Sequence, residues 1–352
     1  MTIAVALSGG VDSTIAAVAL IEAGETVIGL TLELGDDPGA RAAIEDAAAV
    51  CARLHIPHHI VPATGVFRDQ VIGPFIADYA TGRTPNPCIH CNRAIKFGLL
   101  MERAEKLGAD RLATGHYARI AVFPDGPALC KASDADHDQS YFLFAIPRER
   151  LARIVFPLGE ITKTDVRKIA KDAGLPTAHR PDSQDICFVD SGDSYTGLVT
   201  SACPRAGEAG DIVDMKGHVL GRHKGLAHYT IGQRRGLGIA AKAPLYVIAL
   251  DVAANSVIVG PMEALARRRI DLSVCNWLID PPTTPRSAMA KLRATQRPVP
   301  ATVIALQGGS ARVETDIPVS GIAPGQAGVL YDGDRVLGGG WIENSEQESG
   351  AG

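Results

Sequence analysis

The sequence has 352 residues, of which 46% are hydrophobic and 21% charged, with a formal net charge of −4. This composition is that of a globular protein with room for two or three domains. No apolar run approaches about 18 residues without a charge, and the N-terminus lacks a basic, cleavable segment, so we expect a cytoplasmic protein without a membrane span.

Charge is distributed unevenly along the chain. Residues 1–199 carry 19 Lys and Arg against 25 Asp and Glu, net −6, whereas residues 200–352 carry 16 against 14, net +2. Within 216–297 the count is 13 basic against 4 acidic residues. A basic second part suits a polyanionic partner such as a nucleic acid, although clustered charge also occurs on ordinary solvated faces.

The first predicted elements are a buried parallel strand, "TIAVAL", and an apolar helix, "TIAAVALIEAG", joined by the loop "SGGVDS" (Ser8–Ser13). Glycines let an anion approach the main chain, and the amides and dipole of a helix N-terminus attract phosphate. The loop therefore predicts a phosphate site, while Gly-Gly alone also fits an ordinary strand-to-helix turn.

Up to about residue 115, strand-like runs alternate with helical ones, which predicts a doubly wound parallel α/β sheet. The later runs are "TVIGLTL", "HHIVPA" and "RLATG" for strands, and "ARAAIEDAAAVCARL" and "RAIKFGLLMERAEKLG" for helices. Open sheets of this kind bind ligands at the carboxyl ends of their strands, where the phosphate loop lies. A further helix, "TKTDVRKIAKDAGL", has Thr162 or Thr164 as its expected N-cap.

A Cys-x-x-Cys pair, Cys88 and Cys91, stands in "GRTPNPCIHCNRAIKFG", directly before a helix predicted to start near Asn92. Prolines fix a loop, and a helix N-terminus stabilises a nearby thiolate, so the motif predicts reactive thiols; a buried cysteine pair is the alternative. A structural zinc would need two further ligands, and the sequence has no second Cys-x-x-Cys.

The chain has seven cysteines in all, which indicates reduced core thiols plus a reactive or metal site rather than a disulfide framework. Cys187 stands between polar residues and a short apolar run in "RPDSQDICFVD". Cys51 and Cys130 lie inside apolar runs, so we expect both in the core.

Beyond residue 205 the chain changes to short β-rich runs separated by Gly, Pro and Asp, such as "LYVIALDVAANSVIVG". This texture predicts a small mixed domain followed by a β-barrel. We expect a catalytic α/β domain over 1–200, a central domain over 201–265, a barrel over 266–345 and a disordered tail over 346–352.

The phosphate loop matches neither of two common fingerprints. A Walker loop needs a lysine, which Ser8–Ser13 lacks, and a dinucleotide site needs G-x-G-x-x-G. The loop instead resembles the pyrophosphate loop (PP-loop) of ATP-dependent adenylating enzymes, which cleave ATP between the α and β phosphates. In that family the loop holds the departing pyrophosphate, and the aspartate, here Asp12, is placed near Mg²⁺ and the phosphates.

Seven motifs, in an order that covers nearly the whole chain, resemble those of the bacterial tRNA-specific 2-thiouridylases. They are "SGGVDS", "GRTPNPCxxCNxxIKF", "ATGHYAR", "DQSYFL", "DSQDICF", "GQRRGLGI" and "PGQAGVLY". The resemblance implies a pyrophosphatase-type α/β domain, a small central domain and a C-terminal β-barrel. It also implies an enzyme that converts the anticodon wobble uridine of certain tRNAs to 2-thiouridine.

The resemblance gives roles to two cysteines. ATP first adenylates the uridine C2 oxygen, and sulfur then displaces AMP. Cys187 would carry that sulfur as a persulfide, and Cys91 would be the nucleophile that frees it by forming a disulfide. Such a covalent relay divides one hard substitution into easier steps. The sulfur would come from a persulfide-donating carrier protein or a cysteine desulfurase.

The resemblance also implies two sets of binding residues. Those expected to bind ATP are Ala6, Leu7, Ser8, Gly9, Gly10, Val11, Asp12, Ser13, Leu32 and Gly115. Those expected to approach the tRNA are Asn86, Pro87, Cys88, His116, Asp138, Gln139, Ser140, Lys291, Arg293 and Gln326. Because the base must leave its stack before C2 can be reached, and phosphate contacts position RNA without specifying it, we expect recognition of tRNA shape to dominate.

The sequence departs from the family pattern at Cys88, where many members carry an aspartate, and in the runs "TLELG" and "KLRATQR". Cys88, Cys91 and Cys187 would suffice to ligate three irons of a [4Fe-4S] cluster, so cluster-based thiolation competes with the persulfide relay that the other motifs favour. Two other classes stay open. An adenylating enzyme with a small-molecule acceptor would not need the barrel, and a non-catalytic RNA-binding protein would not need both Cys91 and Cys187.

Overall fold

The computed structural model describes residues 1–175, 186–189 and 195–346, so the predicted tail beyond residue 346 lies outside the described residues. The chain forms two compact units. The first contains residues 1–71, 88–184 and 333–337, and the second contains residues 72–87, 185–332 and 338–352. Each unit is therefore assembled from separate stretches of the chain.

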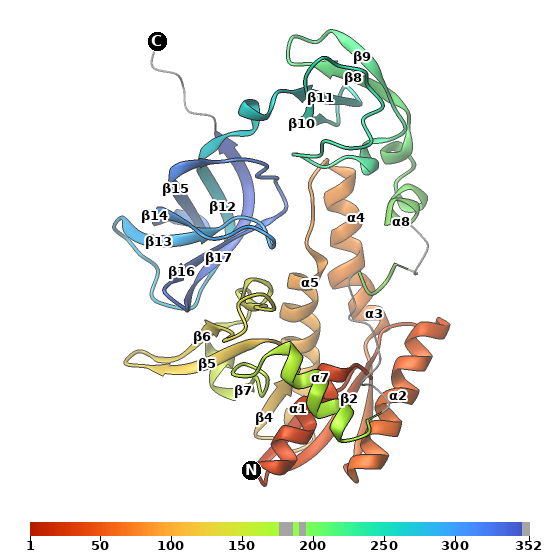
Figure 1. The fold of residues 1–352 in the computed structure, drawn as a ribbon, viewed down its shortest axis with the longest axis vertical. Helices are drawn as coiled ribbons and strands as arrows, with labels where there is room; N and C mark the ends of the chain where they lie inside the picture. Colours follow the sequence, from red (N-terminus) through yellow and green to blue (C-terminus); the bar gives the residue numbers. More distant parts are fainter. Residues whose placement is uncertain (176–185, 190–194, 347–352) are drawn as a thin grey trace. The chain divides into compact units, whose positions relative to one another are not determined.

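The first unit is built on a five-stranded sheet in the order β3-β2-β1-β4-β7. Its strands are β1 (Thr2–Ala6), β2 (Thr26–Glu33), β3 (His58–Pro62), β4 (Arg111–Thr114) and β7 (Ile154–Val155). All pair in parallel, and Ala4 and Val5 of the central strand β1 are fully buried. This confirms the predicted parallel α/β sheet and places the phosphate loop at the carboxyl end of β1 (Figure 1).

Helices follow most of these strands, and local sequence sets their ends. The helices of this unit include α1 (Val11–Glu22), α2 (Pro38–Leu54), α3 (Thr64–Phe67), α6 (Met101–Lys106) and α7 (Lys163–Asp172), with short helical turns at η3 (Ser140–Leu143) and η4 (Arg148–Arg153). Asp37 caps α2 by accepting from the Ala40 amide, and Thr162 caps α7 by accepting from the Asp165 amide. Of the two caps predicted for the later helix, Thr162 is therefore the correct one.

The helix that carries the Cys-x-x-Cys motif begins earlier than predicted. Its first turn, α5 (Pro87–His90), starts at Pro87 rather than near Asn92, because proline fits the first position of a helix, where its missing amide is not needed. The helix continues as a π-helix, η2 (Cys91–Leu100), and runs directly into α6. Cys91 thus lies inside a continuous helix rather than in a loop before one.

A hairpin of β5 (Ala118–Phe123) and β6 (Gly126–Lys131) completes the first unit. Arg335, at the start of β17 (Arg335–Glu346), lies opposite Cys130 of β6. Cys130 and Cys51 are both buried, which confirms that they are core thiols.

The second unit contains a mixed sheet in the order β10-β11-β8-β9. Its strands are β8 (Gly210–Asp214), β9 (Val219–His223), β10 (Tyr246–Asp251) and β11 (Ser256–Gly260), of which only β8 and β11 pair in parallel. Helical segments of this unit are α4 (Gly73–Ala80), α8 (Tyr195–Ala202), η6 (Pro204–Gly207), η7 (Leu226–His228) and η8 (Met262–Leu265); η1 (Arg68–Ile72) precedes α4. Phe75 of α4 and Val199 of α8 share a buried cluster.

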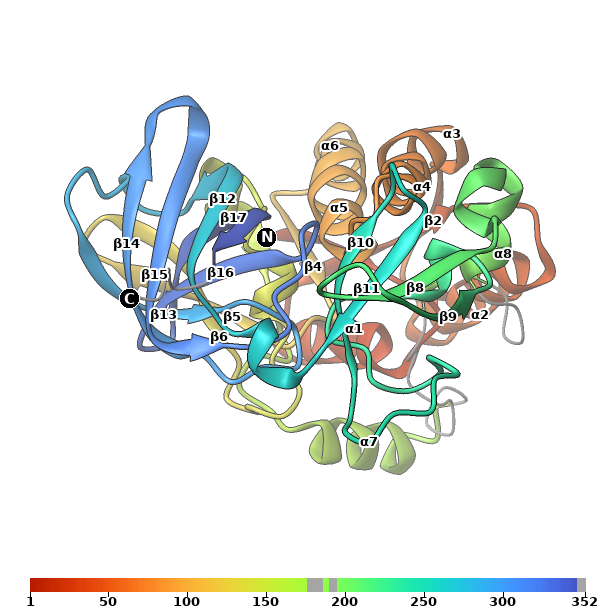
Figure 2. The same ribbon diagram turned by 90° about the horizontal axis from the view of Figure 1, so that it is seen from above.

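A closed antiparallel barrel of six strands also belongs to the second unit, and its strands are coloured from teal to blue in Figures 1 and 2. The strand order is β12-β15-β14-β13-β16-β17, and β12 pairs with β17 to close it. The strands not yet given are β12 (Arg267–Trp277), β13 (Arg286–Lys291), β14 (Val299–Leu306), β15 (Ser310–Val319) and β16 (Ala327–Asp332), with one turn, η9 (Gln307–Gly309). The predicted C-terminal β-barrel is confirmed. Among the described helices, none is both long and apolar enough to cross a bilayer.

Candidate active site in the first unit

The predicted phosphate loop closes on itself through its two serines. Ser13 Oγ accepts from the Ser8 amide at 3.2 Å and donates to the Gly10 carbonyl at 3.1 Å. Gly9 has a φ of +73°, a conformation that favours glycine. Gly10 is the N-cap of α1 and offers no side-chain acceptor, so the first amides of α1 are left for an anion at the positive end of the helix dipole.

Three apolar residues predicted to bind ATP differ in how far their side chains are buried. Leu7 and Val11 are buried in hydrophobic clusters, so they can meet a nucleotide only through the main chain. Leu32 is half-buried near the carboxyl end of β2, opposite Val61 of β3. Its contact with the adenine ring stays a prediction.

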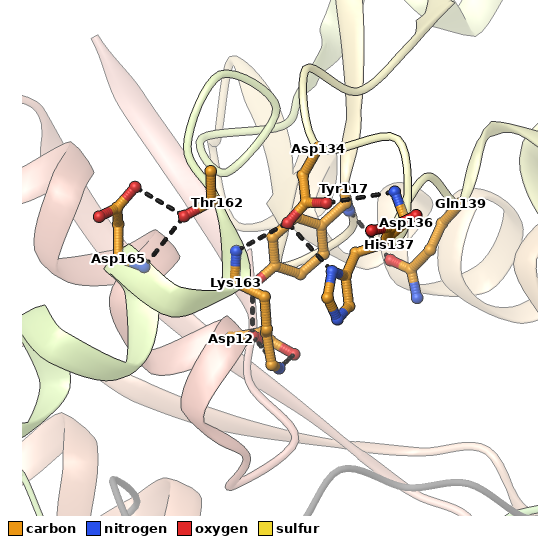
Figure 3. A network of polar contacts seen from close by, with 9 residues as sticks. All are labelled: Asp12, Tyr117, Asp134, Asp136, His137, Gln139, Thr162, Lys163 and Asp165. Atoms are coloured by element: carbon orange, nitrogen blue, oxygen red, sulfur yellow. Dashed lines mark hydrogen bonds and ion pairs between the residues drawn. The ribbon is translucent and has the colours of Figure 1, made fainter.

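Asp12, in the first turn of α1, is held by side chains from distant parts of the chain (Figure 3). Lys163 Nζ lies 2.7 Å from its Oδ1 and 2.8 Å from its Oδ2, and the Tyr117 hydroxyl donates to Oδ1 at 2.9 Å. The Lys163 side chain is 7% exposed and that of Asp12 33%. The carboxylate therefore faces a buried ammonium while keeping access to solvent.

A second carboxylate, Asp134, fixes the start of α7 (Figure 3). Its Oδ2 accepts from the Lys163 amide at 2.9 Å and pairs with His137 Nδ1 at 3.0 Å. Although burial opposes the shift, these hydrogen bonds lower the pKa of Asp134. Two carboxylates thus hold the two ends of Lys163: Asp134 the main chain and Asp12 the ammonium.

The three residues after β4, here called the Gly115–Tyr117 segment, each contact a different part of the site. A Cβ at Gly115 would stand 2.7 Å from Asp12 C and from Ser13 N, so this glycine touches the main chain of the phosphate loop. Lys96 Nζ of η2 lies 3.3 Å from His116 Nε2. Tyr117 bonds Asp12, and the segment therefore links the phosphate loop to the helix that carries Cys91.

The His116 ring is neutral and has a defined tautomer. Desolvation and the neighbouring Lys96 ammonium hold the pKa of His116 well below its usual range. Because an ammonium only donates, Nε2 accepts from Lys96, and Nδ1–H then donates to Thr114 Oγ1 at 2.7 Å. The rings of Phe97 and Phe156 lie 6.0 Å and 6.2 Å from the imidazole, centroid to centroid. The predicted site residue His116 is thus fixed from both nitrogens.

The two thiols of the Cys-x-x-Cys motif differ in exposure, since Cys88 is exposed and Cys91 buried. Desolvation raises the pKa of both thiols, and the Lys96 ammonium lowers both. The π-helix explains why one lysine acts on Cys91: its hydrogen bonds join residues five apart, so Cys91 and Lys96 lie on one side of successive turns. Lys96 therefore faces a thiol and an imidazole.

Cys187 is exposed and belongs to the second unit. Its neighbour Phe188 packs edge-on against Phe75, with ring centroids 5.3 Å apart, so this short segment is anchored to the cluster around α4. The preceding motif residues 182–185 lie outside the described residues. Within the ranges 1–175, 186–189 and 195–346, no three His, Cys, Asp or Glu side chains are grouped as metal ligands.

The residues Asp138, Gln139 and Ser140, predicted to approach tRNA, take part in contacts inside the first unit. Asp138 Oδ2 accepts from Ser140 Oγ at 2.8 Å, and Gln139 Oε1 accepts from the Tyr117 amide at 2.9 Å. Ser140 is fully buried. These residues adjoin the Asp12 network through Tyr117, and their contact with RNA stays a prediction.

The predicted RNA-binding residues of the second unit lie in the barrel and in the segment before Cys88. Gln326 Nε2 donates to the Thr84 carbonyl at 2.8 Å, two residues before Asn86. Lys291 lies in β13 opposite Val329 of β16. The structure therefore ties one end of the Asn86–Pro87 segment to a barrel residue, whereas contacts of Lys291 and Arg293 with RNA stay predictions.

Three family models match successive parts of the chain. They are described as a tRNA methyl transferase HUP domain, matching residues 1–191, a tRNA methyl transferase PRC-barrel domain, matching 202–261, and an aminomethyltransferase beta-barrel domain, matching 267–342. Together they span the α/β sheet, the mixed sheet and the barrel described above.

Curated relatives match at full length. A tRNA-specific 2-thiouridylase of Syntrophotalea carbinolica is 46% identical, over 97% of this chain and 98% of the relative. One of Sphingopyxis alaskensis is 49% identical, over 97% of this chain and 91% of the relative. The chain belongs to the tRNA-specific 2-thiouridylase family. Members of this family are tRNA sulfurtransferases, so the chain is an enzyme.

Solved structures match only part of the chain. A tRNA thiolase of Methanococcus maripaludis, solved with its [4Fe-4S] cluster, is 19% identical over 58% of this chain and 64% of its own, with a TM-score of 0.36. A match of this quality carries no argument about whether this family member holds a cluster.

Three residues of the site were missed by the sequence analysis, which placed them in motifs or helices without a role: Lys163, Tyr117 and Lys96. A lysine at the first position of α7 is the one local signal, because that end of a helix favours anions. Tyr117 stands beside His116 in "ATGHYAR". Lys96 follows Cys91 by five residues, a spacing that places two side chains on one face in a π-helix but not in an α-helix.

The contact of Gly115 with the phosphate loop predicts that Gly115→Ala weakens phosphate binding. The added Cβ would meet loop main chain at 2.7 Å, so the loop must shift, at a cost of about 1–3 kcal/mol. We expect affinity for Mg²⁺-ATP, measured by isothermal titration calorimetry, to fall by about tenfold or more. Gly65→Ala is the control, because a Cβ there meets nothing within 4 Å. Equal affinities in the two variants would contradict this role.

The position of Lys96 predicts a shift in thiol reactivity with pH. Because the pKa of Cys91 is raised, its thiolate fraction at neutral pH is small and increases with pH; removing the Lys96 charge raises that pKa further. Lys96→Met should therefore move the pH midpoint of Cys91 alkylation by iodoacetamide to higher pH, and Lys96→Arg should restore it. One tryptic peptide, Thr84–Arg93, holds both thiols, and fragment spectra distinguish them. An unchanged midpoint, or an equal shift in the exposed-lysine control Lys106→Met, would count against it.

Proposed function

We propose that this protein uses Mg²⁺-ATP to replace the C2 oxygen of the tRNA wobble uridine by sulfur. The observation that best supports this reaction is the Gly115–Tyr117 segment, which contacts the phosphate loop through Gly115 and the thiol-bearing helix through His116. An enzyme that adenylates an oxygen and then delivers sulfur to the same carbon needs a phosphate site and a thiol within reach of one base. The full-length relatives carry the name of this activity.

ATP is the substrate of the first step. The uridine C2 oxygen attacks the α-phosphorus, the bond to the β-phosphate oxygen breaks, and pyrophosphate leaves in the Ser8–Ser13 loop, where the amides of α1 stabilise its charge. Asp12 is the loop carboxylate, and Mg²⁺ on ATP prefers such an oxygen together with phosphate oxygens. Leu32 lies near the carboxyl end of β2 and Gly115 directly follows β4, the two strands that flank β1, and both are assigned to the nucleotide.

Sulfur transfer is the second step, and it uses two thiols. The terminal sulfur of a Cys187 persulfide attacks C2, and AMP leaves with the former C2 oxygen. The Cys91 thiolate then attacks Cys187 Sγ; the sulfur–sulfur bond breaks toward the transferred sulfur, which becomes the thiocarbonyl. The remaining Cys91–Cys187 disulfide must be reduced by a thiol reductant before the next persulfide is loaded. The relay thus needs both cysteines but no other thiol of the chain.

The substrate tRNA and a sulfur donor are the proposed partners. Asn86, Pro87 and Cys88 approach the extruded uridine, and Lys291, Arg293 and Gln326 contact the RNA from the barrel. The basic stretch 216–297 is supported as an RNA-facing part by its count of 13 basic to 4 acidic residues. A persulfide-carrying protein or a cysteine desulfurase loads Cys187, and the reaction takes place in the cytoplasm. The domain division proposed for these tasks is 1–200, 201–265 and 266–345.

Two other chemistries are distinguished by specific features. A cluster would need Cys88, Cys91 and Cys187 as ligands, whereas the relay needs only Cys91 and Cys187. We favour the relay because the other motifs resemble those of persulfide-using family members, and we derive no step through a cluster. An adenylating enzyme with a small-molecule acceptor would leave the barrel and its basic residues without a task.

The relay predicts which cysteines matter. Cys91→Ser and Cys187→Ser should each abolish 2-thiouridine in tRNA, because one removes the attacking thiol and the other the sulfur carrier. Cys51→Ser and Cys130→Ser are the matched controls: both thiols are buried in the core, and desolvation raises the pKa of both. The measurement is mass spectrometry of tRNA nucleosides from cells that carry each variant as the sole copy, which also separates a thiolated nucleoside from a methylated one.

The proposal fails if cells that lack this protein, and have no other enzyme that makes 2-thiouridine, still contain 2-thiouridine in their tRNA. It also fails if the folded Cys187→Ser variant still forms this nucleoside. Loss of 2-thiouridine in a core-thiol control, shown by circular dichroism to be folded, would mean that the reactive thiols are misassigned.

Cys88 separates the relay from the cluster. Under the relay, Cys88→Asp introduces the residue that is common in the family and keeps substantial activity, because Cys88 takes no part in sulfur transfer. Under the cluster, the same change removes a ligand and the activity with it. The assay is thiolation by anaerobically purified wild type and Cys88→Asp, with iron content measured in both. Stoichiometric iron in the wild type together with an inactive Cys88→Asp would replace the relay by the cluster.

A further inference from the structure

The phosphate loop contains no lysine of its own, yet the fold brings one to it. Lys163, which lies 151 positions after Asp12, places its Nζ 2.7 Å and 2.8 Å from the two carboxylate oxygens of Asp12 (Figure 3). Its side chain is 7% exposed. Lysine is rarely buried to this degree unless it is paired, so the position is specific rather than incidental.

Local forces alone do not favour this placement. Lys163 is the first residue of α7, where the positive end of the helix dipole disfavours a cation, and desolvating an ammonium is costly even when it is paired. Several contacts nevertheless hold it there: Asp134 accepts from its main-chain amide at 2.9 Å, and the Tyr117 ring centroid lies 5.7 Å from its Nζ. An arrangement that local electrostatics oppose, at a proposed phosphate site, points to a task in ligand binding.

We infer that Lys163 is the phosphate-binding cation of the loop and that Asp12 occupies its ammonium until the phosphates arrive. This inference rests on the proposed function only in taking Ser8–Ser13 as a phosphate loop. When a Mg²⁺-bound phosphate chain enters, Asp12 turns to the metal and the Lys163 ammonium bonds phosphate oxygens. Without Mg²⁺, Asp12 and the phosphates compete for the same ammonium, and the two anions repel each other.

The competition gives Asp12 opposite effects with and without metal. With Mg²⁺, Asp12→Asn removes a metal ligand and should weaken binding. Without Mg²⁺, the same change removes both the repulsion and the carboxylate that occupies Lys163, so binding should become tighter. The part of the gain that comes from the freed ammonium needs Lys163, so the gain from Asp12→Asn should be smaller in the Lys163→Met background than in the wild type. With a lysine that only braces α7 against α1, Asp12→Asn would give the same gain in the wild-type and Lys163→Met backgrounds.

The experiment measures binding of inorganic pyrophosphate by isothermal titration calorimetry, in Mg²⁺ and in EDTA, with the full-length protein. Lys163→Met should weaken Mg²⁺-pyrophosphate binding by about 10- to 100-fold, the range expected for hydrogen bonds to a charged group. Lys163→Arg keeps the charge, although its planar guanidinium has another shape, and should therefore bind Mg²⁺-pyrophosphate more tightly than Lys163→Met does. Lys168→Met is the matched control, because it removes the same charge from an exposed position of the same helix.

Each outcome decides the inference. The inference is overturned if Lys163→Met and Lys168→Met bind pyrophosphate with equal affinity. It is also overturned if, without Mg²⁺, Asp12→Asn binds pyrophosphate more weakly than the wild type does. If thermal unfolding shows that Lys163→Met does not fold, the Asp12→Asn and Lys163→Arg arms still decide it, since neither removes the cation. Absence of tRNA thiolation with intact, Lys163-dependent pyrophosphate binding would refute the proposed function and leave this inference standing.

Discussion

The close approach between the end of β4 and the phosphate loop is the constraint on which the rest of the site depends. It requires a residue without a side chain at position 115, because a Cβ there would overlap the main chain of Asp12 and Ser13. The two residues that follow Gly115 contact different parts of the site. His116 contacts Lys96 on the helix of Cys91, and the Tyr117 hydroxyl donates to Asp12. The loop proposed to bind phosphate and the helix of Cys91 are thereby linked through one short segment, which suits the proposed reaction because its intermediate passes between steps.

The phosphate loop and the surroundings of Cys91 each contain a lysine that comes from a helix. The two lysines differ in the group that each ammonium contacts. Asp12 forms an ion pair with Lys163, whereas Lys96 contacts the His116 imidazole and, among the described residues, its ammonium lowers the pKa of the nearby thiols. An ion-paired ammonium can be released by a ligand, and an ammonium beside a thiol acts on it continuously. The two lysines therefore suit different tasks, ligand exchange at the phosphate loop and steady electrostatic support beside Cys91.

The sequence was sufficient for the elements whose signals are local. Alternating strand-like and helical runs predicted the parallel sheet, short β-rich runs predicted the barrel, and "SGGVDS" marked the loop between β1 and α1. Contacts between distant residues were missed, because periodicity says nothing about partners that are 105 or 151 positions apart, as Tyr117 and Lys163 are from Asp12. The helix start was misplaced because Pro87 was taken as a loop residue, and the π-helix was missed because ten residues of apolar spacing fit an α-helix almost as well.

The π-helix of η2 has a consequence for how the thiol environment is able to evolve. Widening a helix by one residue per turn changes which side chains share a face without replacing any of them, so the pairing of Cys91 with Lys96 is encoded in pitch rather than in composition. Deleting a single residue between them would tighten the helix and bring the remaining pair to an α-helical spacing of four. Because residues four apart also share a face of an α-helix, relatives with and without such a deletion would both keep the lysine beside the thiol.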